Sequence, residues 1–324
     1  MEWHDVPPPV QVMSIGDPDQ LAATLRDAQV EYLRLGPEPF AATLTAIDLG
    51  PVTLQIAADN AHITRGHVAT DRSVLLFGLD LAEERTRVNG IQIRRGGIVH
   101  LGPGAPMFAS VLEPIVWGAL SFCADTLHAV TAAESLPRQG AFLLRQDGTA
   151  HPKLATFARE ASILAKQDPA RFSLSSVRKS MAEDALRFSM AAAGHPPQMD
   201  ASFRAVRRRV ALVRQAEDLL AASIGEPVYS EDLRQALGVP MRTLHNAFVA
   251  VHGLSIHRYL RLRRLHQARA ALRAGRGNTS HVKIAALSCG FWHLGRFSQE
   301  YRALFGELPS ETIDQGHSAL LSAV

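Results

Sequence analysis

Two short stretches near the end of the chain carry polar side chains of the types that can read the edges of DNA bases. Arginine can pair with guanine through two hydrogen bonds, and asparagine or glutamine can pair with adenine in the same way. Residues of these types, with a threonine and a histidine beside them, follow a turn glycine in each stretch: Arg242, Thr243 and Asn246 in the first, and His293, Arg296 and Gln299 in the second. Both sets need a helix that holds them on one outward face.

The first stretch predicts a helix, a glycine turn and a second helix. Ser230, followed by two acidic residues, has the features of a helix start. Gly238 can take the left-handed conformation that ends such a helix in a tight turn. The second helix is expected to bury a stripe with helical spacing: Leu244, Phe248 and Val251. Its polar residues then face outward, as in a helix that enters the major groove.

The same pattern recurs about fifty residues later. We expect its first helix to bury Ile284, Ala285 and Leu287. Gly290 takes the turn position, and the second helix is expected to bury Phe297, Tyr301, Leu304 and Phe305. Two units with matching turn glycines, Gly238 and Gly290, are a far more specific signal than one. Gly295 stands where a recognition helix usually carries a side chain, so it either lets the backbone approach DNA closely or only weakens the helix.

A continuous helix is predicted between the two units. The segment SIHRYLRLRRLHQARAALRAG supports about eighteen helical residues, or about 27 Å. Successive major-groove faces on one side of B-form DNA are about 34 Å apart, so this spacer and the flanking units could place both second helices in neighbouring grooves. We expect the basic residues nearby to neutralise phosphates or to lie in solvent, rather than to read bases: Arg258, Arg261, Arg263, Arg264, Arg269 and Lys283.

The charge distribution agrees with a polyanion as partner. From Ala201 onward the chain has 17 Lys and Arg against 9 Asp and Glu, whereas the preceding part carries an acidic excess within a total of +3. A basic half is where nucleic acid would bind. An architectural or RNA-binding protein that uses charge alone is an alternative, and it predicts binding that is insensitive to sequence.

These motifs resemble a known family. The segment ALGVPMRTLHNAFVAVHGLSIHRYLRLRRLHQARAAL, followed by AALSCGFWHLGRFSQEYRALFGELPSE, resembles the DNA-binding domain of the AraC/XylS transcription regulators, and the second part is similar to the ethanolamine-operon regulator branch. The resemblance implies a seven-helix domain that reads two consecutive major grooves of promoter or operator DNA. It implies base contacts from the six residues named first, although an arginine there can equally hold a phosphate. It also implies RNA polymerase as a partner, and it favours activation.

The N-terminal part predicts a β-rich domain. Short apolar runs alternate with Gly, Pro, Asn and Asp up to about residue 120, and Asn89-Gly90 predicts a hairpin over residues 85–95. The segment RRGGIVHLGPG, which ends in Pro103-Gly104, is similar to part of the cupin barrels that form the effector-sensing domain of many AraC-type regulators. We therefore expect a cupin-like sensor domain that binds a small-molecule effector.

We expect neither a metal or other cofactor nor catalytic residues. Cupin enzymes need a His-x-His pair with further ligands, whereas His62, His67 and His100 are isolated in the sequence. A cupin-type enzyme fused to a DNA-binding module is the alternative function. Cys123 and Cys289 lie too far apart for a disulfide framework or a zinc cluster, which argues against a DNA-repair alkyltransferase.

The predicted fold class is α+β, with three parts. Residues 1–120 form the cupin-like sensor domain, residues 121–200 a helical dimerisation and linker region, and residues 201–324 an all-α DNA-binding domain with two helix-turn-helix units. In the middle part, helices are expected from about Leu120, and an apolar face either forms a homodimer or packs back on the barrel: Val177, Met181, Ala185, Phe188 and Met190. Gly194–Pro197 is expected to be a linker. Without a signal peptide or a membrane span, we expect a cytoplasmic protein that does not bind membranes.

Overall fold

The computed structural model describes residues 8–80, 85–93, 97–124, 126, 141–145, 151–193, 201–223, 226–274 and 279–313. The chain divides into two compact units, of which the first comprises Met1–Tyr32 and Phe40–Phe203, and the second Leu33–Pro39 and Arg204–Val324. Within the described ranges, no helix combines the length and the apolar character needed to cross a membrane. The predicted linker Gly194–Pro197 lies outside the described residues.

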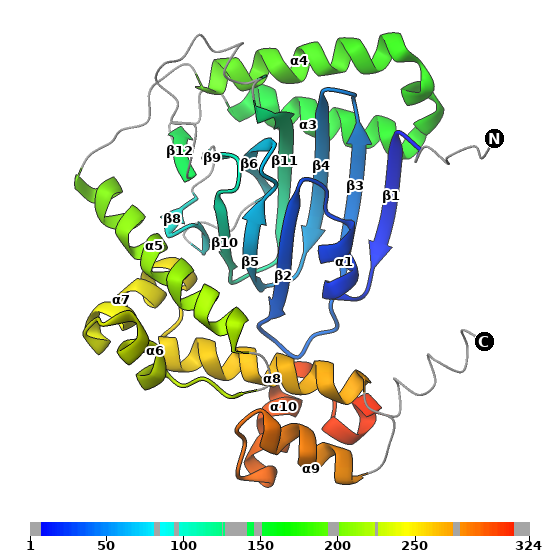
Figure 1. Cartoon of the computed structure of the whole chain (residues 1–324). Helices are drawn as coiled ribbons and strands as arrows, with labels where there is room; N and C mark the ends of the chain where they lie inside the picture. The colour runs from blue at the N-terminus through cyan, green and yellow to red at the C-terminus, as the bar shows by residue number, and fades with distance from the viewer. Residues whose placement is uncertain are drawn as a thin grey trace, which may run out of the picture. The chain divides into compact units, whose positions relative to one another are not determined.

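The first unit is built on two β-sheets (Figure 1). The larger sheet has the strand order β1 (Val10–Ile15), β3 (Ala42–Asp48), β4 (Val52–Asp59), β11 (Ile115–Cys123), β6 (Arg72–Asp80), β9 (Ile98–Leu101) and β12 (Ala141–Arg145). Its neighbouring strands are all antiparallel. The smaller sheet has the order β2 (Ala28–Arg34), β5 (His62–Val68), β10 (Pro106–Val111), β7 (Thr86–Val88) and β8 (Ile91–Gln92). The short helix α1 (Pro18–Thr24) follows β1.

The hairpin predicted from Asn89-Gly90 is confirmed for its described residues. Strands β7 and β8 pair antiparallel, with Val88 opposite Ile91. Asn89 has φ 49° and Gly90 has φ 72°, the positive values that a type I′ turn requires at both central positions.

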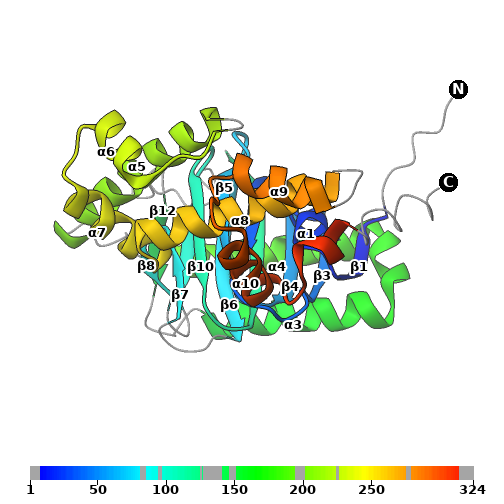
Figure 2. The same cartoon turned by 90° about the horizontal axis from the view of Figure 1, so that it is seen from below.

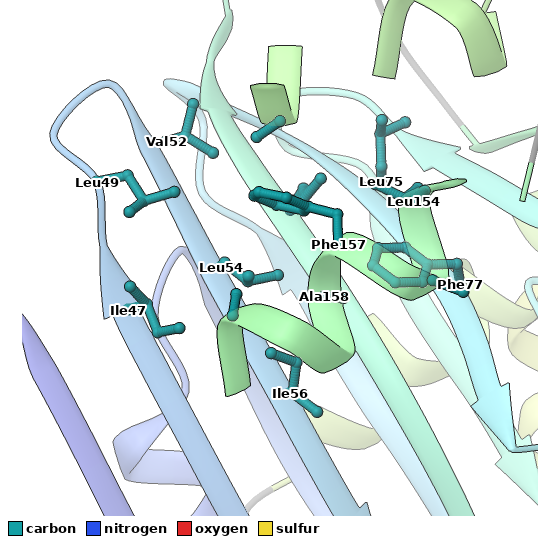
Figure 3. Close-up of a cluster of buried hydrophobic side chains, with 14 of the residues drawn as sticks. Ile47, Leu49, Val52, Leu54, Ile56, Leu75, Phe77, Leu154, Phe157 and Ala158 are labelled. Carbon is teal, nitrogen blue, oxygen red and sulfur yellow. The ribbon is translucent and has the colours of Figure 1, made fainter. Parts of the chain in front are cut away.

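The central strands of the larger sheet are buried on both faces. In β4, VTLQIAAD, seven of the eight residues are buried, which explains its nearly continuous apolar run. One face packs against helix α3 (His151–Gln167). Figure 3 shows Leu154, Phe157 and Ala158 of this helix among sheet residues such as Leu54 and Phe77.

Helix α4 (Ser175–Ala193) follows α3 after a short 3₁₀ helix, Pro169–Ser173. Of its predicted apolar face, Ala185 is buried in the same core, and Met181 and Phe188 pack against it. The rings of Phe157 and Phe188 are 5.7 Å apart. This face therefore packs back on the β-rich unit, which was one of the two alternatives; Met190 is 39% exposed.

The prediction of helix from Leu120 onward is wrong at its start. Residues up to Cys123 belong to strand β11, and β12 adds a further strand to the larger sheet. The run LSFC is apolar but short, and a buried strand cannot be distinguished from a buried helix by periodicity over so few residues. Most of the remaining segment between Cys123 and Ala141 lies outside the described residues.

The second unit is helical. It contains α5 (Ala201–Ala222), α6 (Ser230–Leu237), α7 (Met241–His252), α8 (Ile256–Ala274), α9 (Thr279–Ser288) and α10 (Leu294–Phe305). The predicted spacer is confirmed as one continuous helix, α8, of 19 residues. Figures 1 and 2 show α8 running between the α6–α7 pair and the α9–α10 pair. The observed class is α+β, as predicted, with a β-rich N-terminal part and a helical C-terminal part.

Buried charged groups tie α5 to this unit. Arg263 of α8 donates a hydrogen bond to the carbonyl of Leu220 at 3.1 Å, and its Nη1 lies 3.7 Å from a carboxylate oxygen of Glu217. His252 of α7 lies 3.9 Å from the same carboxylate and stacks on Tyr259 with ring centroids 4.4 Å apart. The cluster therefore joins three helices.

Candidate nucleic-acid interface

The first helix pair consists of α6, a short turn and α7. The N-cap of α6 is Tyr229, one residue earlier than predicted, and its backbone N–H donates to the Asp232 carboxylate at 2.8 Å. Ser230 lies in the first turn, where its hydroxyl is 3.1 Å from Nδ1 of His257. Gly238 ends α6 with φ 63° and ψ 29°, the left-handed conformation expected from the sequence.

Helix α7 has the two faces that were predicted. The stripe Leu244, Phe248 and Val251 is completely buried. The three polar residues Arg242, Thr243 and Asn246 are exposed. Their side chains are therefore open to a ligand along one side of this helix.

The second helix pair consists of α9, a turn and α10. Gly290 has φ 76°, and the predicted stripe of α10 is buried: Phe297, Tyr301, Leu304 and Phe305. The polar residues His293, Arg296 and Gln299 are exposed, with His293 at the N-cap. Each pair thus exposes the three polar side chains predicted for it, and the buried stripe lies on another face of the same helix.

One predicted core residue of α9 is wrong. Ile284 is 62% exposed, and the buried residues are Ala285 and Ala286. The buried face of α9 is thus formed by two small residues, and the larger Ile284 side chain faces solvent. Trp292, at 71% exposed, lies in the turn before α10 and was not identified from the sequence.

Arg264 links the two pairs. Its guanidinium carbon lies 4.8 Å from the ring centroid of Tyr229, at the start of α6, and 5.4 Å from that of Phe291, in the turn before α10. Burial lowers the pKa of the Arg264 guanidinium from its usual value, because the charged form loses hydration. Sequence analysis assigned Arg264 to phosphates, but the structure places its cation between two aromatic rings.

Arg261 also has a partner inside the unit. Its Nε and Nη2 donate to the two carboxylate oxygens of Glu300 on α10. The same carboxylate accepts a hydrogen bond from Nε of Arg296 at 3.0 Å. Of the residues expected to meet phosphates or solvent, Arg258 and Lys283 are exposed. The others are held by internal contacts: Arg261, Arg263, Arg264 and Arg269.

The first unit contains a cavity of about 60 Å³, whose lining residues could not be named from the sequence. Its wall is mostly apolar and includes five side chains with nitrogen or oxygen atoms: Tyr32, His62, Thr64, Thr86 and Trp117. The Trp117 indole donates to the buried Asp59 carboxylate at 3.1 Å, and burial raises the pKa of this carboxyl group. Among the described residues, no group of three or more His, Cys, Asp or Glu is placed to hold a metal ion.

The turn of the second pair makes a specific prediction. A Cβ at position 290 would lie 2.6 Å from the Tyr229 hydroxyl and 3.1 Å from Nη1 of Arg264, in a backbone conformation that L residues avoid. Gly290→Ala should therefore destabilise the helical unit by about 2 kcal/mol or more. Gly238→Ala is the control, because its backbone is equally left-handed but a Cβ there meets nothing within 4 Å.

The free energy of unfolding is measured by urea denaturation, with hydrogen exchange of the α8 amides as the readout. We expect Gly238→Ala to cost only the backbone strain, about 1 kcal/mol. Equal losses in the two variants would contradict the close contact between the second turn and Tyr229.

Comparison with known proteins gives consistent matches. A family model described as a helix-turn-helix domain matches residues 233–315. The XylDLEGF operon transcriptional activator of Pseudomonas putida is 40% identical over 85 residues, which are 26% of each chain. The probable thc operon regulatory protein of Rhodococcus erythropolis is 33% identical over 102 residues, covering 32% of this chain and 31% of that protein.

A solved structure, a probable AraC family transcriptional regulator from Rhodopseudomonas palustris, is 36% identical with a TM-score of 0.29. The match covers 32% of this chain and 96% of that one. The chain spans only about a quarter to a third of the length of the curated relatives named above.

Proposed function

Because the chain belongs to the AraC/XylS family of transcription regulators, we propose that it binds promoter or operator DNA sequence-specifically and activates transcription. The observation that carries this proposal is the pair of helices α7 and α10. Each follows a left-handed glycine turn, buries an apolar stripe and exposes three polar residues. In this proposal α6–α7 and α9–α10 are two helix-turn-helix units, with α7 and α10 as recognition helices.

The spacer supports simultaneous reading of two grooves. Helix α8 has 19 residues, so its axis is about 28 Å long. It packs against both helix pairs, and its Arg264 contacts Tyr229 at the start of α6 and Phe291 in the turn before α10. Since successive major-groove faces are about 34 Å apart, a rigid helix of this length plus the widths of the two units matches their spacing. We propose a long, asymmetric site for each chain.

The first unit is proposed to be a cupin-like sensor. Its support is the mostly apolar cavity with the polar atoms of Tyr32, His62 and Thr64 at its wall. At about 60 Å³ the cavity is smaller than the roughly 150 Å³ that admits benzene, so it suits a very small effector or expands on binding. The proposal includes a homodimer and contact with RNA polymerase. Exposed Ile163 and Leu174 are candidate apolar contacts for the dimer.

Footprinting tests the proposed function. DNA fragments selected from a random library by the full-length protein should share one motif, and the footprint should cover two major-groove segments about 10 base pairs apart. Binding that shows no enrichment of any sequence would favour the alternative of charge-only binding. Protection confined to about half a dozen base pairs would contradict the engagement of both units.

Arg296 and Lys283 are predicted to contribute differently. Arg296→Ala should reduce binding of the selected duplex by about 1–3 kcal/mol and relax the preference at one or two base pairs. Lys283→Ala, which changes an exposed residue on α9, should weaken selected and random duplexes equally and reduce the salt slope by about one. Titrations at several salt concentrations measure both effects. Equal losses on the two duplexes in Arg296→Ala would assign Arg296 to a phosphate.

A side chain at position 295 is predicted to affect the stability of the helical unit and its affinity for DNA in different ways. A Cβ at this position would meet nothing within 4 Å, so neither packing nor a positive φ requires glycine. Gly295→Ala should therefore raise the stability of the helical unit by about 0.5–1 kcal/mol. If the α10 backbone lies close to DNA, the same change lowers affinity for the selected duplex. Thermal unfolding and DNA titration of one preparation measure the two effects. Higher stability with unchanged affinity would show that Gly295 only weakens the helix.

A further inference from the structure

We propose that Glu300 is a positioning residue that orients Arg296 for recognition of a guanine, with Arg261 as its anchor. The inference rests on the proposed function and extends it to a residue that does not itself touch DNA. It arises from the Glu300 carboxylate on α10, which accepts hydrogen bonds from Arg261 of α8 and from Arg296 of α10.

The geometry of Arg296 carries the first step. Its Nε donates to Oε1 of Glu300 at 3.0 Å, one helical turn away on α10. This contact engages Nε and leaves the two Nη groups for a second acceptor. A guanidinium can bind a different acceptor along each of its edges, and the O6 and N7 atoms of guanine suit the Nη edge. The Arg296 side chain is 68% exposed, so this edge is open to a ligand.

The anchoring of Glu300 carries the second step. Arg261 of α8 donates to both carboxylate oxygens, and the Glu300 side chain is only 25% exposed. A carboxylate held from a neighbouring helix has little freedom to move. It therefore fixes the long Arg296 side chain in one arrangement before DNA arrives, which reduces the conformational entropy lost on binding.

The charge of Glu300 carries the third step. A carboxylate on a helix that enters a groove repels phosphates and lowers affinity for any DNA. If this position served only to increase affinity for DNA, a neutral or basic residue would be expected there. Glu300 is therefore expected to reduce non-specific binding and to improve discrimination. Its removal should raise the affinity for random DNA and lower the ratio of specific to random binding.

The test compares E300Q with a matched control. E231Q removes the same charge from an exposed ion pair elsewhere in the unit, Glu231 with Arg234 on α6. On a random duplex, both variants should bind as tightly as the wild type or more tightly. On the selected duplex, E300Q should lose about fivefold or more in the ratio of specific to random binding, whereas E231Q should keep this ratio.

Base substitution locates the effect. E300Q should lose discrimination at the same base pair at which Arg296→Ala relaxes the preference. The double variant, E300Q with Arg296→Ala, should lose no more of the ratio of specific to random binding than Arg296→Ala alone. Thermal unfolding of both variants checks the fold. If E300Q lowers the midpoint, R261Q, which releases Glu300 without removing it, should lower the same ratio.

The outcomes separate this inference from the proposed function. A wild-type protein that binds selected and random duplexes equally would overturn both. A selective wild type with an unchanged ratio in E300Q and R261Q would overturn only the positioning role. Additive losses in the double variant would have the same meaning, because independent residues add.

Discussion

The arrangement of the two helix pairs depends on the position of one cation. Arg264 of α8 lies between the rings of Tyr229 and Phe291, which belong to different pairs. Each such contact is worth about 0.5–2 kcal/mol, the more so when partly desolvated. Gly290 leaves just enough space for this packing, since a side chain there would strike both Tyr229 and Arg264. The relative placement of the two candidate recognition helices therefore follows from contacts of α8 rather than from the turns alone.

The basic excess of the second unit is not all available to a polyanion. Arg261 is engaged with Glu300, Arg263 is buried near Glu217, and Arg269 donates to Glu307 at 2.9 Å. In the sequence these arginines cannot be told apart from Arg258, which is exposed. A count of charges thus agrees in sign with a polyanionic partner, but it overestimates how many arginines are without an acidic partner inside the unit. Their division into structural and free cations depends on acidic residues that lie far away in the sequence.

Local patterns predicted what local interactions determine. The hairpin at Asn89-Gly90, the single helix α8 and the buried stripes of α7 and α10 each follow from spacing or from backbone requirements of one short segment. The errors have non-local causes. Residues 120–123 are strand because they pair with β4 and β6, and the buried positions of α9 are Ala285 and Ala286 rather than Ile284. The role of Arg264 and the cavity beside Tyr32 arise from distant segments. For the six polar residues of α7 and α10 the structure shows exposure, and their contact with bases stays a prediction.

Helix α10 departs from local rules beside Arg296 only. Its buried stripe and its left-handed end at Gly306 are what stability alone would select. Gly295, by contrast, weakens the first turn although the space for a side chain is empty, and Glu300 places a negative charge on a helix proposed to approach phosphates. Departures of this kind are expected where a ligand, rather than the fold, decides the residue. Since Gly295 is unfavourable for the free protein and Glu300 for non-specific attraction, both residues agree with the proposal that this helix approaches DNA and that Arg296 is oriented on it.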